Sequence, residues 1–394
     1  MDTPEQPLDV PRYDVEAAVR ARYSAASMER EAALCCPVDY DPRYLAVLPA
    51  EVLERDYGCG DPSRYVREGD VVLDLGSGGG KICFIASQIV GAGGRVIGVD
   101  LNDDMLDLAR RSAPVVGARI GYENVAFRRG RIQDLALDLD ALDTWLAAHP
   151  VHNSRDRAAL SEYEARQRRD APMIANGSVD VVVSNCVLNL VDDDAKPQLI
   201  REIFRVLKVG GRIAISDIVS DEVAPPALRD DPVLWSGCIS GAFSEYELLR
   251  LLEEAGFHAI TLDKWQAEPW QVVQGIEFRS VTVTAHKGKQ GECREANQAV
   301  IYRGPWKQVE DDDGHVFRRG ERVAVCAKTF TLLTTGPYEG QTIGIEPLTT
   351  IPEAERALFD CTRTSARHPR ESKGLDYDET RDGTGACCAP GESC

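Results

Sequence analysis

The chain has 394 residues and a formal net charge of −19, from 64 acidic and 45 basic side chains. This charge argues against a protein that neutralises nucleic-acid phosphates or docks on an anionic membrane, and it favours a small-molecule substrate. No stretch reaches about 18 apolar residues, and the first 20 residues lack the apolar core of a signal peptide, so we expect a cytoplasmic protein. In a reducing compartment the 12 cysteines are expected to serve in catalysis, metal or metalloid binding, or burial rather than in a disulfide framework.

The patterning changes along the chain and predicts four regions. Residues 1–69 are patterned as an N-terminal helical cap, and residues 70–288 alternate β-rich runs with helical stretches. This alternation predicts an α/β fold with a doubly wound, mostly parallel sheet of about seven strands, interrupted by a helix-prone insertion at 138–178. Residues 289–361 predict a small α+β or β domain, and residues 362–394 a flexible tail that contains cysteines.

The predicted elements of the large domain follow one another as strand and helix. The strands are expected at 70–76, 94–100, 124–130, 179–185, 211–219, 258–267 and 278–288. The helices between them are expected at 81–90, 104–114, 195–208 and 245–257. Beyond them, strands are expected at 298–304 and 321–333, and the second of these contains Cys326.

A glycine turn follows the first strand in VLDLGSGGGKICF and lets the backbone approach a ligand closely. Gly76, Gly78 and Gly80 fit G-x-G-x-G, whereas Lys81 occupies the third glycine position of a dinucleotide-binding G-x-G-x-x-G. Preceded by Asp74, the turn resembles motif I of the class I methyltransferases, which bind S-adenosylmethionine.

Further candidate cofactor residues lie at the ends of the next strands. Asp100 ends the second strand, where an acid can accept hydrogen bonds from both ribose hydroxyls. Ile132 and Gln133 follow the third strand, where the methyltransferase pattern has an apolar residue beside adenine and a polar one at its amino group. Met105 and Asn185 complete the candidate set. Glycines and terminal acids can also simply make turns, but Asp74 and Asp100 in register with strand ends favour a cofactor site.

Three cysteines have contexts that argue against ordinary core positions. Cys186, in VVVSNCVLNL, lies two residues beyond the fourth strand and faces the crevice where open α/β sheets bind ligands. Cys238 follows the fifth strand after a proline-rich loop that could return it across that crevice. Cys59 is flanked by glycines before the first strand, and the doublet Cys35-Cys36 lies further upstream.

The remaining cysteines are interpreted as follows. Free cysteine is among the most buried residue types, so Cys83 in a helix and Cys326 in a strand are expected to be core residues. Cys293 and Cys361 have no clear context. The tail carries the others, Cys387, Cys388 and Cys394.

Soft thiolates near a methyl sulfonium favour trivalent arsenic as the methyl acceptor. Thiolates select soft ions over hard ones. Trivalent arsenic bonds up to three sulfurs in a pyramid and keeps a lone pair that can attack a methyl carbon in line. Holding that lone pair in place makes the step effectively unimolecular, and no general base is needed.

Five motifs in order resemble those of the arsenite methyltransferase family. They are YGCG at 57–60, LDLGSGGG at 73–80, SNCVLNLV at 184–191, RVLKVGGR at 205–212 and LWSGCISGA at 234–242. The two cysteine motifs SNCVxNL and LW-x-x-C are the specific ones. The resemblance spans roughly residues 15–290 and continues weakly beyond, and it implies a Rossmann-like class I methyltransferase fold.

The resemblance also implies roles for individual residues. Cys186 and Cys238 would hold the arsenic and Cys59 would join them. An upstream cysteine, Cys35 or Cys36, would pair with Cys59 in a disulfide relay renewed by thioredoxin or glutathione. No structural metal, nucleic acid or membrane partner is expected. Three departures limit the transfer. The Cys35-Cys36 doublet leaves the relay partner open and lies closer to Cys59 in sequence than in other members. Gly237 stands where some members have a carboxylate, and the 138–178 insertion is longer than expected.

Two other functions remain open at this point. The first is a methyltransferase for a small organic acceptor such as a quinone precursor, in which the cysteines are incidental. The second is a thiolate metal-binding protein in which four cysteines close a Zn²⁺ site. The absence of a C-x₂-C pair disfavours the second.

Overall fold

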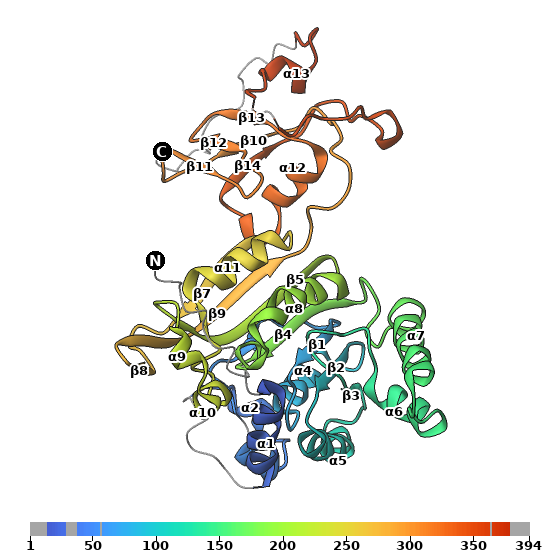
Figure 1. Ribbon diagram of the computed structural model, residues 1–394. Coiled ribbons are helices and arrows are strands. Elements are labelled where there is room, and N and C mark those ends of the chain that lie inside the picture. The colour runs from blue at the N-terminus through green and yellow to red at the C-terminus, as the bar shows by residue number, and fades with distance from the viewer. Residues whose placement is uncertain (1–13, 29–37, 56, 363–364, 379–394) are drawn as a thin grey trace, which may run out of the picture. The chain divides into compact units, whose positions relative to one another are not determined.

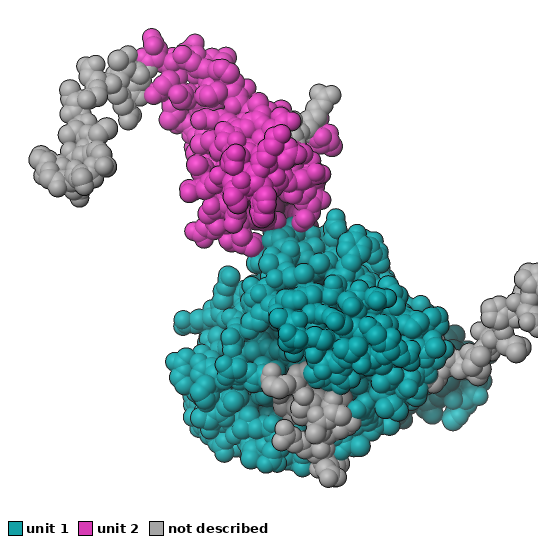
Figure 2. Space-filling view, turned by 90° about the vertical axis from the view of Figure 1, so that its left-hand side faces the viewer, with its two compact units in different colours: residues 1–288 teal, residues 289–394 magenta. Residues whose placement is uncertain are grey.

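The computed structural model describes residues 14–28, 38–55, 57–362 and 365–378. Cys35, Cys36 and the three tail cysteines lie outside these ranges. The chain divides into two compact units, residues 1–288 and 289–394 (Figures 1 and 2). Among the described helices, none has the length and apolar character needed to cross a bilayer.

The first unit is built on one large sheet. Its strands are β1 (Val71–Leu75), β2 (Arg95–Asp100), β3 (Val125–Arg129), β4 (Val179–Asn185), β5 (Leu207–Ser220), β6 (Phe243–Ser244), β7 (His258–Trp265), β8 (Gln271–Val273) and β9 (Ile276–His286). The main path has the order β3-β2-β1-β4-β5-β9-β7, with β6 beside β5 and β8 beside β9. The first five strands pair in parallel, whereas β9 is antiparallel to both β5 and β7. The predicted doubly wound, mostly parallel sheet is therefore confirmed.

Helices cover both faces of this sheet. They are α1 (Val15–Met28), α2 (Pro42–Leu45), α3 (Ala50–Glu54), α4 (Lys81–Val90), α5 (Asp103–Ile120), α6 (Leu139–Ala148), α7 (Ser154–Asp170), α8 (Lys196–Val206), α9 (Pro226–Arg229), α10 (Pro232–Ser236) and α11 (Glu245–Glu254). Helices α4 and α5 pack on one face, and α8 and α11 on the other (Figure 1). Neighbouring residues of β1 enter opposite cores, Val72 the first and Leu73 the second, so apolar residues follow one another along this part of the strand.

The region expected as an insertion forms the helix pair α6 and α7. Asp138 begins α6 by accepting the backbone N–H of Ala141, and Asn153 caps α7 in the same way. Trp145 of α6 stacks on Tyr163 of α7 with ring centroids 4.7 Å apart. Figure 1 shows the pair beside the sheet, with α6 near β3.

The second unit has its own small core. It contains β10 (Ala299–Tyr302), β11 (Gln308–Glu310), β12 (Val316–Arg318), β13 (Arg322–Ala324), α12 (Ala327–Thr334), β14 (Thr342–Ile345) and α13 (Pro369–Lys373). Strand β10 lies between β13 and β14 in an antiparallel sheet, while β11 and β12 form a separate hairpin.

Two expectations about this unit are wrong. The strand expected at 321–333 ends at Ala324 and gives way to helix α12, because the Cys326 side chain caps the helix by accepting the backbone N–H of Thr329. The segment from 362 is also not simply a polar tail. Arg367 is buried and makes an ion pair with Glu295 at 2.8 Å, which ties this segment to the start of the unit.

Candidate active site

A cavity of about 370 Å³ opens at the carboxyl ends of β1, β2 and β4. This edge is where open parallel sheets bind ligands, and the volume suits a small-molecule cofactor. Its lining includes most of the predicted cofactor residues, namely Asp74, Gly76, Gly78, Asp100, Met105, Ile132, Gln133 and Asn185, together with Cys186. Gly80 is not part of the lining: it begins α4 with a φ of 89°.

The glycine turn brings bare backbone to the cavity. Gly76 and Gly78 both have left-handed backbone, with φ of 68° and 49°. A side chain on Gly76 would meet Val187 at 2.3 Å, whereas the space beside Gly78 is open. Glycine at these two positions therefore keeps the turn tight and leaves room for a ligand.

Asp100 links the turn to the second strand. Its two carboxylate oxygens accept the backbone N–H of Gly78 and of Asn102, each at 2.8 Å. Burial raises the pKa of this carboxyl above its usual value, and this effect exceeds the lowering of the pKa by the two hydrogen bonds. Each oxygen keeps a second lone pair, so Asp100 can still accept a ligand hydroxyl.

Helix α1 covers the cavity, and its residues Val15, Val19 and Tyr23 contribute to the lining. Arg131 holds the helix through an ion pair with Glu16 at 2.7 Å. At the opposite side, Arg22 donates to the carbonyl of Val233 in α10 at 2.8 Å. The expected helical cap is thus part of the site, and its contacts join the cofactor cavity to the segment that carries Cys238.

The three candidate cysteines of the first unit converge beside this cavity. Cys59 and Cys186 are joined by a disulfide with their Cα atoms 5.9 Å apart. The Cys238 sulfur lies 3.5 Å from the carbonyl oxygen of Cys186. All three belong to one apolar cluster, in which Cys59 and Cys238 are 6% and 5% exposed. Cys59 is thus bonded to Cys186 in the structure rather than to an upstream cysteine.

Two of these cysteines have an unusual backbone. Cys186 directly follows β4, with a φ of 58°. Cys238 follows α10 with a φ of 62°. The left-handed region is unfavourable for residues with a Cβ, and such residues are concentrated at functional sites.

Asn185 holds the loop that carries Cys59. Its side-chain oxygen accepts the backbone N–H of Cys59 at 2.9 Å and of Gly60 at 3.1 Å. Its amide nitrogen donates to the Gly60 carbonyl at 2.8 Å and to the Tyr40 hydroxyl at 3.1 Å. A side chain on Gly58 would come within 2.3 Å of this amide. Asn185 lines the cavity, but its polar atoms are committed to the Cys59 loop rather than to a ligand.

Asp217 is a site residue that the sequence analysis missed. It is fully buried in β5, and one of its carboxylate oxygens lies within 4.8 Å of the sulfurs of Cys59 and Cys186. It accepts the backbone N–H of Leu188 and the side-chain amide of Asn189, each at 2.9 Å. Burial raises the pKa of Asp217 to about 7, although its hydrogen bonds act to lower the pKa. An acid inside the apolar run AISDIV was the available signal.

Tyr23 was also missed, and it connects α1 to Cys238. Burial raises the pKa of Tyr23 well above its usual value, and a hydrogen bond with Cys238 adds to the effect. The phenol therefore stays protonated at neutral pH. Nothing in the local sequence around Tyr23 signals this contact, because it depends on how α1 packs.

Comparisons with known proteins assign relatives to both units. Residues 67–167 and 151–256 match a family described as "Methyltransferase domain", and residues 289–377 match one described as "Domain of unknown function (DUF8838)". The chain is 32% identical over 325 residues to the arsenite methyltransferase of Aquipseudomonas alcaligenes, which covers 78% of this chain and 83% of the relative. It is 30% identical over 364 residues to the arsenite methyltransferase of Homo sapiens, covering 87% of this chain and 86% of the relative.

A solved structure matches most of the chain. The crystal structure of an arsenic (III) S-adenosylmethionine methyltransferase from Chlamydomonas reinhardtii superposes with a TM-score of 0.54. It is 25% identical in sequence, and the match covers 84% of this chain and 100% of that chain.

Proposed function

Because the chain belongs to the arsenite methyltransferase family, we propose that it transfers methyl groups from S-adenosylmethionine to trivalent arsenic held on its cysteine thiolates, in arsenic detoxification. The observation that carries the proposal is the place of Cys186. This residue lines the cavity at the glycine turn and is also in contact with both Cys59 and Cys238. One residue thus connects a cofactor cavity to a group of thiols.

The residues around the cavity fit S-adenosylmethionine. The carboxylate of Asp100 is available to the ribose hydroxyls, and Ile132, Gln133 and Met105 line the same cavity. The open space beside Gly78 allows close approach of the ligand to backbone. When bound, this cofactor supplies a methyl group on a positively charged sulfur, which an arsenic lone pair can attack.

The cysteines bind the substrate and fix its orientation. Each thiol displaces one hydroxyl of arsenite as water, so Cys59, Cys186 and Cys238 together can replace all three. With three arsenic–sulfur bonds, the arsenic is pyramidal and its lone pair points away from the three sulfurs. The apolar surroundings of the sulfurs limit the access of water to the bound arsenic. Alignment of this kind lowers the barrier without a general base.

Thiol oxidation returns the arsenic to its trivalent state. Methyl transfer uses the lone pair and leaves pentavalent arsenic, which two thiolates can reduce by two electrons as they form a disulfide. The Cys59–Cys186 disulfide is one such oxidised pair, and its reduction frees two ligands for the next substrate. A relay through Cys35 or Cys36 remains part of the proposal, with thioredoxin or glutathione as the reductant.

The test is incubation of the full chain with arsenite, glutathione and methyl-labelled cofactor, followed by separation of the arsenic species. We expect labelled methylated arsenic, with no consumption of cofactor when arsenite is left out. Transfer of label in the absence of arsenite would instead indicate an organic acceptor and would contradict the proposal.

A further inference from the structure

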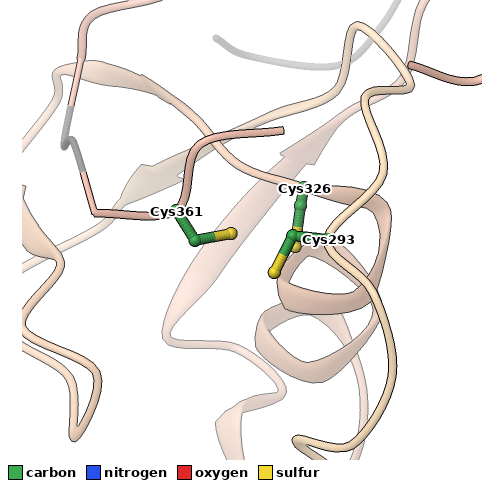
Figure 3. A group of neighbouring side chains, drawn as sticks. All are labelled: Cys293, Cys326 and Cys361. Carbon is green, nitrogen blue, oxygen red and sulfur yellow. The ribbon is translucent and has the colours of Figure 1, made fainter. Parts of the chain in front are cut away.

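Three cysteines of the second unit, Cys293, Cys326 and Cys361, form a group that the proposed reaction does not use. Their sulfur atoms all lie within 4.8 Å of one another, and none of the three is in a disulfide. Figure 3 shows the side chain of Cys361 pointing toward the other two. Cys326 is fully buried, whereas Cys293 and Cys361 are partly exposed, so a small solute can reach these two residues.

Backbone hydrogen bonds hold the three segments in this arrangement. The carbonyl of Cys293 accepts the N–H of Phe359 at 2.8 Å, which pairs the segments of Cys293 and Cys361. The carbonyl of Arg294 accepts the N–H of Ala327 at 2.8 Å, which brings the Cys293 segment to the start of α12. Cys326 caps that helix, and its sulfur lies 3.4 Å from the backbone nitrogen of Thr329. The sulfurs are therefore positioned by the fold rather than by chance contact of mobile chains.

No fourth ligand accompanies the three sulfurs in the described part of the chain. His315 is the nearby candidate, because one of its ring nitrogens lies 2.8 Å from the carbonyl oxygen of Cys361 and the other 2.8 Å from a carboxylate oxygen of Asp311. Both ring nitrogens are thus engaged in these hydrogen bonds, and His315 does not belong to the group of three sulfurs.

The number of sulfurs decides which ion fits. Structural Zn²⁺ sites are almost always tetrahedral and need four protein ligands. Trivalent arsenic needs three sulfurs and keeps a lone pair in the fourth direction. Three thiols that have no fourth ligand among the described residues match arsenic rather than zinc.

We propose that Cys293, Cys326 and Cys361 form a second binding site for trivalent arsenic, separate from the methyl-transfer site. Arsenite reacts with the three thiols to form three arsenic–sulfur bonds, and three water molecules leave. Arsenic remains trivalent, so the step needs no oxidant or reductant. The identification of the bound ion as arsenic rests on the proposed function, whereas the grouping of the three thiols is independent of that function.

The experiment isolates this site in the full-length chain. Serine replaces every cysteine except the three of the group and Cys83, and the eight replaced are Cys35, Cys36, Cys59, Cys186, Cys238, Cys387, Cys388 and Cys394. The remaining thiols are Cys83 and the three of the group. This protein is kept reduced with a phosphine and dialysed against arsenite, and bound arsenic is measured by mass spectrometry. We expect one equivalent, with three sulfurs around arsenic by X-ray absorption.

Single substitutions in this background then test the group. Cys293→Ser, Cys326→Ser and Cys361→Ser are each expected to lower the affinity for arsenite by at least about tenfold, since each removes one of three linked bonds. Serine also caps helices well, so Cys326→Ser keeps α12. Cys83→Ser is the matched control and should leave binding unchanged. Phenylarsine oxide needs only two thiols and should bind all the single variants.

Three outcomes would overturn the proposal. They are no bound arsenite in the isolating background, equal loss with Cys83→Ser, and stoichiometric zinc in the purified parent that arsenite does not displace. Failure of the proposed function is a different result: the parent would make no methylated arsenic while the isolating variant still binds arsenite. Conversely, if the parent methylates arsenic but the isolating variant binds no arsenite, only the proposal of a second site is wrong.

Discussion

Replacing Asn185 with alanine tests whether this residue positions Cys59 or binds the cofactor. The substitution removes the side-chain oxygen that accepts the buried N–H of Cys59 and the partly buried N–H of Gly60, and the described residues offer these two groups no other acceptor. The Gly60 carbonyl keeps the Tyr40 hydroxyl at 3.0 Å. An unpaired buried donor costs about 1 to 3 kcal/mol, and the partly buried donor of Gly60 adds a smaller amount, so we expect the closed loop to lose about 2 to 4 kcal/mol.

The consequence should be selective. Cys59 would leave its place beside Cys186, so methylation of inorganic arsenite should fall by at least about tenfold, because about 1.4 kcal/mol already corresponds to that factor. Cofactor affinity by calorimetry should change by less than about threefold, since the amide is committed to the loop and not to a ligand.

A matched control separates this effect from general damage. Ser280→Ala removes the hydroxyl that donates to the Cys59 carbonyl at 2.7 Å, and it should cost only about 0.5 to 1.5 kcal/mol of unfolding free energy. The reasoning is refuted if Asn185→Ala unfolds at the same denaturant concentration as the parent, or if it loses cofactor affinity while arsenite methylation at saturating cofactor is unchanged.

Three further predictions concern other parts of the chain. Asp100→Ala should weaken cofactor binding far more than Asp74→Asn, because it leaves two ribose hydroxyls unpaired at about 1 to 3 kcal/mol each, and equal calorimetric affinity for the parent and the Asp100 variant would disprove this. The stability that Asp217 gains from its raised pKa is present near pH 4 and is lost as pH rises through about 7. The unfolding free-energy deficit of Asp217→Asn relative to the parent should therefore shrink between pH 5 and pH 8, and a constant deficit would contradict it. Truncation after Asp378 removes the tail cysteines and should lower turnover mainly at limiting arsenite, whereas loss at saturating arsenite would place the tail in the active site.

The sequence predicted the elements that depend on local patterns. The apolar runs at β1 to β5 and the glycine turn at Gly76 carry their own signals, because strand periodicity and turn chemistry are local. Cys186 could be placed at the crevice for the same reason, since the end of a parallel strand fixes its position in a sheet.

Contacts between distant segments could not be predicted in this way. Asn185 was assigned to the cofactor, because nothing local indicates that the Cys59 loop returns 126 residues away in sequence to bind its amide. Cys326 was interpreted as a lone core residue, because its proximity to Cys293 and Cys361 arises only when three segments of the second unit meet. The left-handed backbone at Cys186 and Cys238 has no sequence signal either, since neither is glycine.

Arsenic speciation with two substrates tests the central claim most directly. Inorganic arsenite offers three hydroxyls for thiols to displace, whereas trivalent monomethylarsenite offers two. Cys186→Ser and Cys238→Ser should each abolish methylation of both substrates. Cys59→Ser, and the variant of whichever of Cys35 and Cys36 serves the relay, should impair methylation of arsenite and spare that of monomethylarsenite. Methylation of arsenite by Cys186→Ser at the parent rate would contradict transfer to thiolate-held arsenic.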